Sequence, residues 1–340
     1  MVSIYFTANG GKIMAVKGGC MGYEPPFART PQIENLSLEI AELIGSLPPS
    51  SELGTSPHLH RKLRIRTIHS SLLIEGNALT EDQVTAVIDG KQVLGAAKDI
   101  LEVQNANRAY ELLDAVDPCR IEDLLRIHKV MMDGLAKEAG SFRSQNVGVY
   151  DGGTLIHAGT PSNYVPEVMS DLFAWLRATE MHPLISSCIF HYEFEFAHPF
   201  ADGNGRCGRL WHTLLLSRWR PVLKWLPIES VIQQRQQEYY ASIAASNAAG
   251  SCEAFVAFML KVIRDAIAPY AVRKSDKDIR KERILSFIAE DAGITVPQLI
   301  EKTGYSKRSI ERDISELKKE GALKRKGSPR AGIWEIGPLS

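Results

Sequence analysis

The sequence predicts a mainly α-helical protein in two parts: a helical body with one small β-hairpin, and a shorter C-terminal module of helices and strands. Three observations support this fold class. Apolar residues recur at helical spacing over most of 33–267. A Gly-Gly turn flanked by apolar residues interrupts that pattern within 140–160, which indicates a hairpin. After residue 272 the chain becomes basic and ends on strand-like segments around a polar turn.

Composition and charge are those of a globular protein. The chain has 340 residues, of which 44% are hydrophobic and 24% charged, enough for two or three domains of roughly 150 residues each. Residues 273–330 carry 16 Lys and Arg against 10 Asp and Glu, whereas residues 1–272 carry 24 against 29. No CxxC pair occurs among the five cysteines, which argues against a zinc cage or a disulfide framework. No stretch approaches the ~20 apolar residues of a membrane span, and the start of the chain has no continuous apolar segment. We therefore expect no membrane contact and a cytoplasmic location.

Composition shifts along the chain predict four segments. They are a flexible tail at 1–30, an N-terminal helical region at 31–110, a core at 111–270 and a C-terminal module at 271–340.

The C-terminal module has the pattern of three short helices followed by a strand, a basic turn and a strand. Ser306 is expected to cap the third helix through its hydroxyl. The pattern resembles a winged helix, with 306–320 in the recognition-helix position and Lys324 to Arg330 at the wing. Contact with DNA and contact with another protein are equally compatible with it.

The stretch HPFADGNGRCGR, which begins at His198, joins two apolar helical segments. The proline that follows His198 disfavours helix at the histidine, so the first helix is expected to end there. Gly203, Asn204 and Gly205 allow successive N–H groups to form a concavity at the start of the second helix. Such a concavity binds phosphate, helped by the helix dipole.

Charged side chains around this turn complete a site for a nucleotide phosphate. Arg206 and Arg209 are three residues apart and therefore share a helix face, where they can hold phosphate oxygens. Asp202 offers the oxygen ligands that Mg²⁺ prefers. His198 lies at the rim, where it can accept a proton from an incoming hydroxyl group.

The same stretch matches the Fic-domain signature H-x-F-x-[D/E]-G-N-G-R-x-x-R at each specified position, and the order of elements over roughly 33–267 also resembles this family. The resemblance implies a Fic-type helical bundle that transfers AMP from ATP to a Ser, Thr or Tyr hydroxyl of a target protein. It also implies a role for each matched residue. His198 is the general base, Asp202 holds Mg²⁺, Gly203, Asn204 and Gly205 form the anion hole, and Arg206 and Arg209 contact phosphates, Arg209 the γ-phosphate.

Two further segments resemble family features around the nucleotide. The hairpin near 150–158 resembles the flap that pairs with the target segment, and its nucleotide-facing residues are expected at Thr154, Leu155, Ile156 and His157. The segment EYYASIAASNAAG resembles the adenosine-side pattern, which places Tyr239, Tyr240 and Asn247 around the base and ribose.

An inhibitory motif is also suggested. Residues 71–76 read SLLIEG, which resembles the Fic inhibitory pattern [S/T]-x-x-x-E-[G/N]. Ser71 and Glu75 are four residues apart, so both can face one site. In the family this glutamate pairs with the second arginine of the signature, here Arg209, and leaves the γ-phosphate without its partner. A displacement of about 1 Å at the reacting atom costs ~100-fold in rate, so one ion pair suffices as a restraint.

Alternative hypotheses remain open from the sequence. The same fold serves removal of AMP, or transfer from another phosphate donor. A non-enzymatic hypothesis makes the chain a DNA-binding regulator whose body is a sensor. Homodimerisation occurs among related proteins, but no sequence feature decides it here.

Overall fold

The structure is a computed structural model. It describes residues 5–6, 12–13, 22–47, 52–151, 154–271, 276–327 and 332–337. The chain divides into two compact units, residues 1–271 and 272–340.

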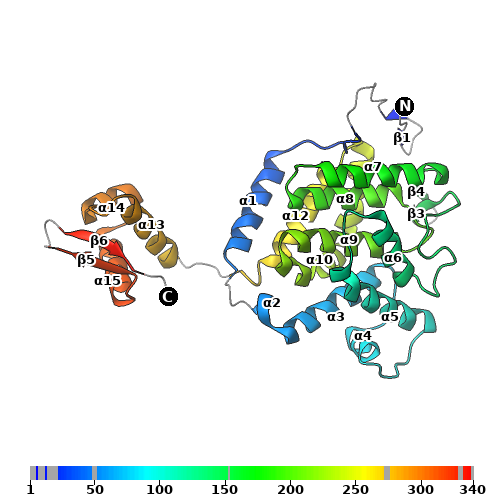
Figure 1. Ribbon diagram of the computed structural model, residues 1–340, viewed down its shortest axis with the longest axis horizontal. Helices are drawn as coiled ribbons and strands as arrows, with labels where there is room; N and C mark the ends of the chain where they lie inside the picture. Colours follow the sequence, from blue (N-terminus) through cyan, green and yellow to red (C-terminus); the bar gives the residue numbers. More distant parts are fainter. Residues whose placement is uncertain are drawn as a thin grey trace. The chain divides into compact units, whose positions relative to one another are not determined.

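The first unit is built almost entirely of helices (Figure 1). They are α1 (Pro31–Gly45), α2 (Glu52–Thr55), α3 (Pro57–Ile74), α4 (Glu81–Ile88), α5 (Ala97–Glu111), α6 (Ile121–Met131), α7 (Val165–Ala178), α8 (Pro183–Ala197), α9 (Asn204–Trp219), α10 (Ile228–Gln234), α11 (Gln236–Ala249) and α12 (Glu253–Ile267). Short 3-10 turns lie at η1 (Leu112–Ala115), η2 (Ser162–Tyr164) and η3 (Pro221–Trp225). Two antiparallel strand pairs accompany them, β1 (Tyr5–Phe6) with β2 (Lys12–Ile13) and β3 (Gly148–Asp151) with β4 (Thr154–Ala158).

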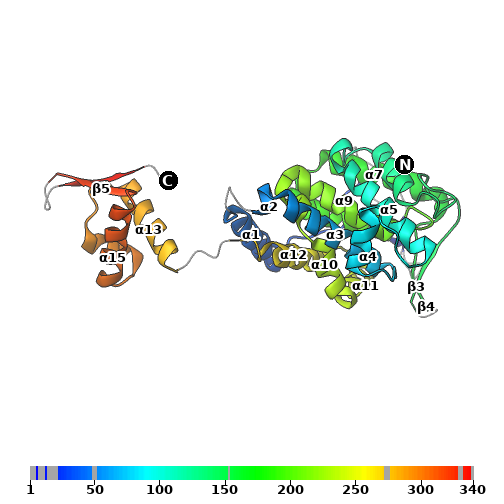
Figure 2. The same ribbon diagram turned by 90° about the horizontal axis from the view of Figure 1, so that it is seen from below.

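Helix α8 forms the centre of this unit, because it is apolar on nearly all sides and must be covered all round. It packs against α7, α9 and α12, and α1 covers α12 from the other side (Figures 1 and 2). Phe190 and Phe194 of α8 are fully buried, as is Trp211 of α9. The loop that joins α8 to α9 therefore starts and ends on two of the best-anchored helices of the unit.

Helix α3 brings a second segment towards that loop. It begins at Pro57 behind a capping Ser56, whose hydroxyl accepts from Leu59 N–H. It ends at Ile74, with Glu75 as its C-cap and Gly76 in the left-handed region at φ 87°. Ser71 and Glu75 thus lie at the C-terminal end of a helix that packs against α4, α5, α9 and α10.

Residues 22–30, which the sequence predicts as part of a flexible tail, contact the helical body. Tyr23 Oη donates to Glu193 Oε2 at 2.6 Å, and Ala28 N–H donates to Glu253 Oε1 at 2.6 Å. The backbone N–H of Cys252 donates to Pro26 C=O at 3.1 Å. These contacts are made mainly by backbone groups of a Pro-rich stretch. A periodic pattern of apolar residues therefore could not predict them. Most of residues 1–21 lie outside the described part of the chain.

The second unit has its own hydrophobic core. Its elements are α13 (Asp276–Glu290), α14 (Val296–Thr303) and α15 (Lys307–Lys319), then β5 (Leu323–Lys326) paired antiparallel with β6 (Ile333–Ile336). Ser306 caps α15 by accepting from Ser309 N–H, which confirms that prediction. Trp334 Nε1 donates to Ile294 C=O at 2.9 Å and ties β6 to the helices. Within the expected wing, residues 328–331 lie outside the described part.

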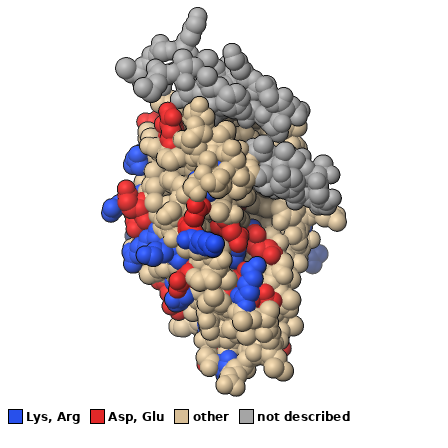
Figure 3. Space-filling model, turned by 90° about the vertical axis from the view of Figure 1, so that its right-hand side faces the viewer, with Lys and Arg blue, Asp and Glu red and all other residues tan. Residues whose placement is uncertain are grey.

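The predicted fold class is confirmed: a mainly α body that contains the expected hairpin, β3 with β4, followed by three helices and a two-stranded wing. The sequence did not predict the short pair of β1 with β2. Acidic and basic side chains are interspersed on the face drawn in Figure 3. Among the described residues, no helix combines the length and the apolar character that a bilayer crossing requires.

Candidate active site

The turn between α8 and α9 has an unusual backbone at both of its ends. His198, the C-cap of α8, adopts φ 48° and ψ 61°, and among the described residues it is the one non-glycine with a positive φ. Because the following proline disfavours helical backbone at His198, the helix ends and the chain turns sharply there. Gly203 adopts φ 85° at the N-cap of α9, a conformation that favours glycine. A β-carbon at Gly203 would also lie 2.6 Å from Met132 Sδ.

The N-terminus of α9 is the predicted anion site. In any helix the N–H groups of the first turn have no intrahelical partner and carry the positive end of the dipole. Among the described residues, no side chain caps these groups in α9. The Asn204 side chain points elsewhere. It accepts from Phe200 N–H and donates to Phe200 C=O, both at 2.9 Å. Asn204 therefore holds the loop in shape, and an anion would meet its backbone rather than its amide.

His128, on α6, contacts the loop between α8 and α9 through its ring. Its ring stacks on Phe200 with centroids 3.6 Å apart and planes within 3°. Gly140 N–H donates to His128 Nδ1 at 2.9 Å, so the proton is on Nε2, which donates to Asp202 C=O at 3.0 Å. Burial lowers the pKa of His128, which favours this neutral form. Phe200 itself is fully buried.

Arg143 fastens the other end of the turn. Its Nε donates to His198 C=O at 2.7 Å, Nη1 donates to Gln145 C=O at 2.9 Å, and Nη2 donates to Thr160 C=O. Its backbone N–H donates to Pro199 C=O at 3.0 Å. Since Gln145 and Thr160 flank the β3–β4 hairpin, this buried arginine joins the hairpin's base to the His198 peptide. Burial lowers the pKa of Arg143.

Arg206 lies between two carboxylates. Its Nη1 donates to Glu102 Oε1 at 3.1 Å and its Nη2 to Asp202 Oδ1 at 2.9 Å. Glu102, on α5, also accepts from Asn77 Nδ2 at 2.8 Å. Arg206 is 3% exposed, so this network fixes its direction. Its predicted contact with phosphate stays a prediction.

Arg209 lies against the end of α3. Its Nε donates to Ser71 Oγ at 3.1 Å, and its Nη2 donates to Ser71 C=O at 2.9 Å and to Glu75 Oε1 at 2.8 Å. Burial alone would lower the pKa of Arg209, but the negative charge of Glu75 outweighs it and the pKa lies above its ordinary value. A β-carbon at Gly205 would overlap the Glu75 carboxylate. Glu75 therefore lies directly over the first turn of α9.

Asp202 is the carboxylate of this turn that is most open to a metal. Asp202 is 53% exposed, and its Oδ1 accepts from Gly203 N–H at 2.6 Å as well as from Arg206. Within the described residues, no group of three or more His, Cys, Asp or Glu side chains could hold a metal ion. One exposed carboxylate fits Mg²⁺, which is commonly held by one or two carboxylates together with substrate phosphates and water.

The hairpin residues predicted to face the nucleotide all lie on β4. Gly148 pairs with Ala158 and Asp151 with Thr154, with an irregularity between Val149 and Tyr150. The backbone of Thr154, Leu155, Ile156 and His157 is therefore in a strand, but their side chains lie outside the described part. Their contacts with a nucleotide stay predictions.

The residues predicted around the adenosine are on α11. Tyr240 is half-exposed, whereas Tyr239 is buried with its Oη 3.2 Å from His191 Nε2. Asn247 Oδ1 accepts from Tyr192 Oη at 2.9 Å. Helix α11 starts beside the end of α3, since Gln236 Nε2 donates to Ile74 C=O at 3.3 Å. Their roles towards a nucleotide stay predictions.

A buried polar layer lies behind Arg209, and sequence reasoning missed it. Burial raises the pKa of Glu195 to about 8 and lowers that of His212 to about 4. Burial also lowers the pKa of His191, whose Nε2 is 3.8 Å from Glu195 Oε1. A β-carbon at Gly208 would lie 2.6 Å from the same oxygen. Burial in this layer favours the protonated form of Glu195, which packs against the helix that carries Arg209.

Comparison with known proteins places both units in known families. Residues 118–216 match the Fic/DOC family, and residues 277–324 match a winged helix-turn-helix DNA-binding family. Two curated relatives are named protein adenylyltransferases. The one from Caenorhabditis elegans is 29% identical over 232 residues, covering 62% of this chain and 42% of the relative. The one from Nematostella vectensis is 26% identical over 253 residues, covering 70% and 54%. The chain thus spans about half the length of these relatives.

Solved structures show the same fold. The structure of C. elegans Fic-1 is 23% identical, with a TM-score of 0.56 over 70% of each chain. The structure of a Fic family protein from Desulfovibrio desulfuricans G20 is 41% identical, with a TM-score of 0.71. The alignment with the latter covers 94% of this chain and 99% of that chain, so both units are shared. With this likeness added to the geometry of the loop between α8 and α9, the chain belongs to the Fic family.

Proposed function

We propose that the chain is an adenylyltransferase that moves AMP from ATP to a Ser, Thr or Tyr hydroxyl of a protein, and that Glu75 restrains it. One observation supports the proposal: His198 and the uncapped N-terminus of α9 lie at the two ends of one short loop, so the proposed base is close to the proposed anion site. The names of the curated relatives support the same reaction.

The proposed reaction follows from these positions. His198 takes the proton of the target hydroxyl as its oxygen attacks the α-phosphorus of ATP. The bond between the α-phosphorus and the oxygen that bridges to the β-phosphate breaks, and pyrophosphate leaves. The N–H groups of the first turn of α9 stabilise the negative charge on the phosphate oxygens. Asp202 is the residue proposed to hold Mg²⁺, which would neutralise phosphate charge when bound.

The proposed restraint acts through Arg209. This arginine is the one expected to hold the γ-phosphate, and in the structure its guanidinium is bound to Ser71 and Glu75. The Glu75 carboxylate also covers Gly205, where phosphate oxygens would approach the helix. A triphosphate would have to displace a carboxylate of its own sign to align there, so the transfer is expected to be slow.

The test is intact-mass spectrometry of the full chain incubated with ATP, Mg²⁺ and a protein fraction, with the chain itself as one acceptor. The Glu75→Gly variant should add one AMP to an acceptor faster than the wild type, and Glu75→Gly with His198→Ala should add none. Asp82→Gly removes an exposed carboxylate of α4 and serves as the matched control. A mass increment on the acceptor other than that of AMP would support transfer from another phosphate donor. Loss of AMP from a modified acceptor would support an enzyme that removes AMP.

A second proposed function concerns the C-terminal unit, which we propose contacts nucleic acid. On α15 the exposed residues Arg308, Arg312, Ser315 and Lys319 are spaced by four, three and four, so they form one stripe opposite the buried Ile310 and Ile314. The full chain should bind duplex DNA with an affinity that falls steeply as salt rises. Replacing Arg308 and Arg312 by Gln should reduce that slope by about 2. A salt-independent interaction would instead favour a protein partner.

A further inference from the structure

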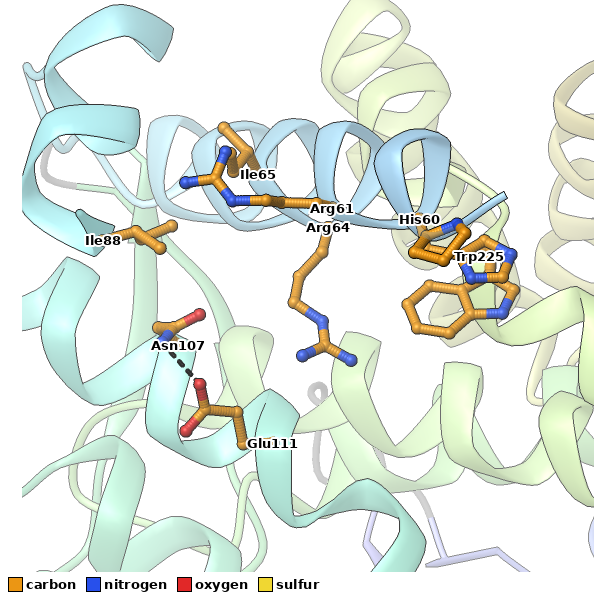
Figure 4. A pocket seen from close by; sticks show the side chains of 9 residues that line it. His60, Arg61, Arg64, Ile65, Ile88, Asn107, Glu111 and Trp225 are labelled. Atoms are coloured by element: carbon orange, nitrogen blue, oxygen red, sulfur yellow. Dashed lines mark hydrogen bonds between the residues drawn. The ribbon is translucent and has the colours of Figure 1, made fainter. Parts of the chain in front are cut away.

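A hollow opens on the first unit, and none of the residues of the candidate active site lines it. It measures about 360 Å³, which is within the range of small-ligand pockets. Its walls come from the first half of α3, the end of α4, the last turns of α5 and η3 (Figure 4). These walls supply charged, aromatic and aliphatic side chains.

Arg64 supplies a positive charge inside the hollow. Figure 4 shows its guanidinium extending from α3 into the space between Trp225 on one side and Glu111 on the other. The neighbouring arginines of α3, Arg61 and Arg66, each pair with a carboxylate at an end of α4. Within the described part of the chain, no carboxylate lies within ion-pair distance of Arg64, although the pKa of Asp114 is lowered by its pairing with Lys224 and, to a smaller extent, by the charge of Arg64. The Arg64 guanidinium is therefore available to an anion in the hollow.

Trp225 supplies an aromatic edge, because the His60 ring covers its indole and the Lys224 ammonium also lies 5.2 Å from the ring centroid. The His60 ring stacks on its indole with centroids 4.0 Å apart and planes within 3°, and His60 Nε2 is 2.8 Å from Leu53 C=O. The Arg64 guanidinium carbon lies 5.2 Å from the indole centroid. Ile65 and Ile88 line the hollow as well. A planar, unsaturated group fits this combination of an aromatic edge and apolar side chains.

Glu111 supplies the opposite charge. Its carboxylate accepts from Asn107 Nδ2 at 2.9 Å, and both residues line the hollow. Glu111 and Arg64 face the same space without forming an ion pair with each other. A molecule with an anionic group at one end and an N–H donor at the other would pair with both.

We infer that this hollow binds a small planar organic anion, with a carboxylate or phosphate ester at Arg64, an unsaturated ring beside Trp225 and an amino group towards Glu111. The inference is independent of the proposed transfer reaction, because the two sites share no residue.

The test follows the indole N–H resonances of the full-length chain labelled with ¹⁵N-tryptophan, of which there are five. Trp225→Phe assigns the resonance of interest. Titration with 4-aminobenzoate should shift the Trp225 resonance saturably, and the other indoles should stay in place. Arg64→Gln should weaken that binding about 10- to 100-fold. Arg66→Gln makes the same change on α3 outside the hollow, and it should leave the affinity for 4-aminobenzoate unchanged.

A second pair of measurements tests the far end of the hollow and guards against misfolding. Glu111→Gln should weaken binding of 4-aminobenzoate but not of benzoate, which has no amino group. Unchanged resonances of the other indoles would show that each variant is folded. A Trp225 resonance that stays fixed up to about 10 mM 4-aminobenzoate, or equal affinities in Arg64→Gln and Arg66→Gln, would overturn the inference.

Discussion

The side chain of Asn204 and the peptide groups of Phe200 form a reciprocal pair of hydrogen bonds, each 2.9 Å long. Both residues are buried. The pair closes the loop between α8 and α9 on itself, and it accounts for an asparagine at a position where the first turn of α9 needs only its backbone.

Asn204→Ala should therefore destabilise the protein as well as the site. The substitution leaves a buried N–H and a buried C=O of Phe200 without partners, which costs about 2–4 kcal/mol in the free energy of unfolding. Urea unfolding of the full chain measures the loss. Asn107→Ala, which removes one hydrogen bond to a surface carboxylate, should cost less than about 0.5 kcal/mol. Equal losses in the two variants would contradict a special role for the Asn204 side chain.

The contacts of Arg209 predict a graded release of the proposed restraint. Glu75→Gly removes the charged partner and should raise the initial rate of AMP transfer by up to ~100-fold. Ser71→Ala removes one hydrogen bond to Arg209 Nε but keeps the bond to the Ser71 carbonyl, so its gain should be smaller. The rates are compared at one ATP concentration with radiolabelled ATP. If Ser71→Ala released as much activity as Glu75→Gly, the charge of Glu75 would not be the restraint.

His128→Phe should keep the stack on Phe200 and lose the two hydrogen bonds of the imidazole, one from Gly140 N–H and one to Asp202 C=O in the loop. Loss of these bonds should cost about 1–3 kcal/mol. Because burial lowers the pKa of His128 below its ordinary value of 6.5, the unfolded chain takes up that proton first as pH falls. The contribution of His128 to the free energy of unfolding is thus complete above about pH 6.5 and is lost as the pH falls. Urea midpoints between pH 7 and 5 should fall less steeply in the variant, and parallel curves would contradict this account.

Glu195 predicts a pH dependence of the opposite sign. Its pKa is raised from 4.5 to about 8 by burial. The folded chain therefore holds a proton that the unfolded chain releases, and stability falls by up to about 1.4 kcal/mol per pH unit between these values. Glu195→Gln should flatten the curve of unfolding free energy between pH 5 and 8. Glu238 is an exposed carboxylate on α11. As the control, Glu238→Gln should leave the slope of unfolding free energy against pH unchanged.

The sequence alone predicted those parts of the fold and site whose signals are contiguous. Helical spacing, the Gly-Gly hairpin and the cap at Ser306 are local patterns, and the structure has each of them. The stretch from His198 to Arg209 is likewise unbroken, so its loop between two helices could be predicted. The roles of its residues towards ATP stay predictions.

The supports of the loop could not be predicted, because they come from distant segments and act on backbone groups. Arg143 and His128 hold the carbonyls of His198 and Asp202 across separations of 55 and 74 residues. A carbonyl is the same at every position, so no residue pattern marks which one an arginine will meet. Glu102 is one of three acidic residues on α5, and only packing brings it to Arg206.

The contact between Arg209 and the end of α3 joins two segments of one chain within one compact unit. Its occupancy is therefore set by an intramolecular equilibrium and does not change when the protein is diluted or its abundance in a cell rises. An inhibitor supplied as a separate polypeptide would dissociate at low concentration and could be outnumbered by its enzyme. Under the proposed restraint, each copy of the chain would carry its inhibitory carboxylate from the moment it folds, and a stimulus would act by separating the end of α3 from Arg209 rather than by changing the supply of a partner.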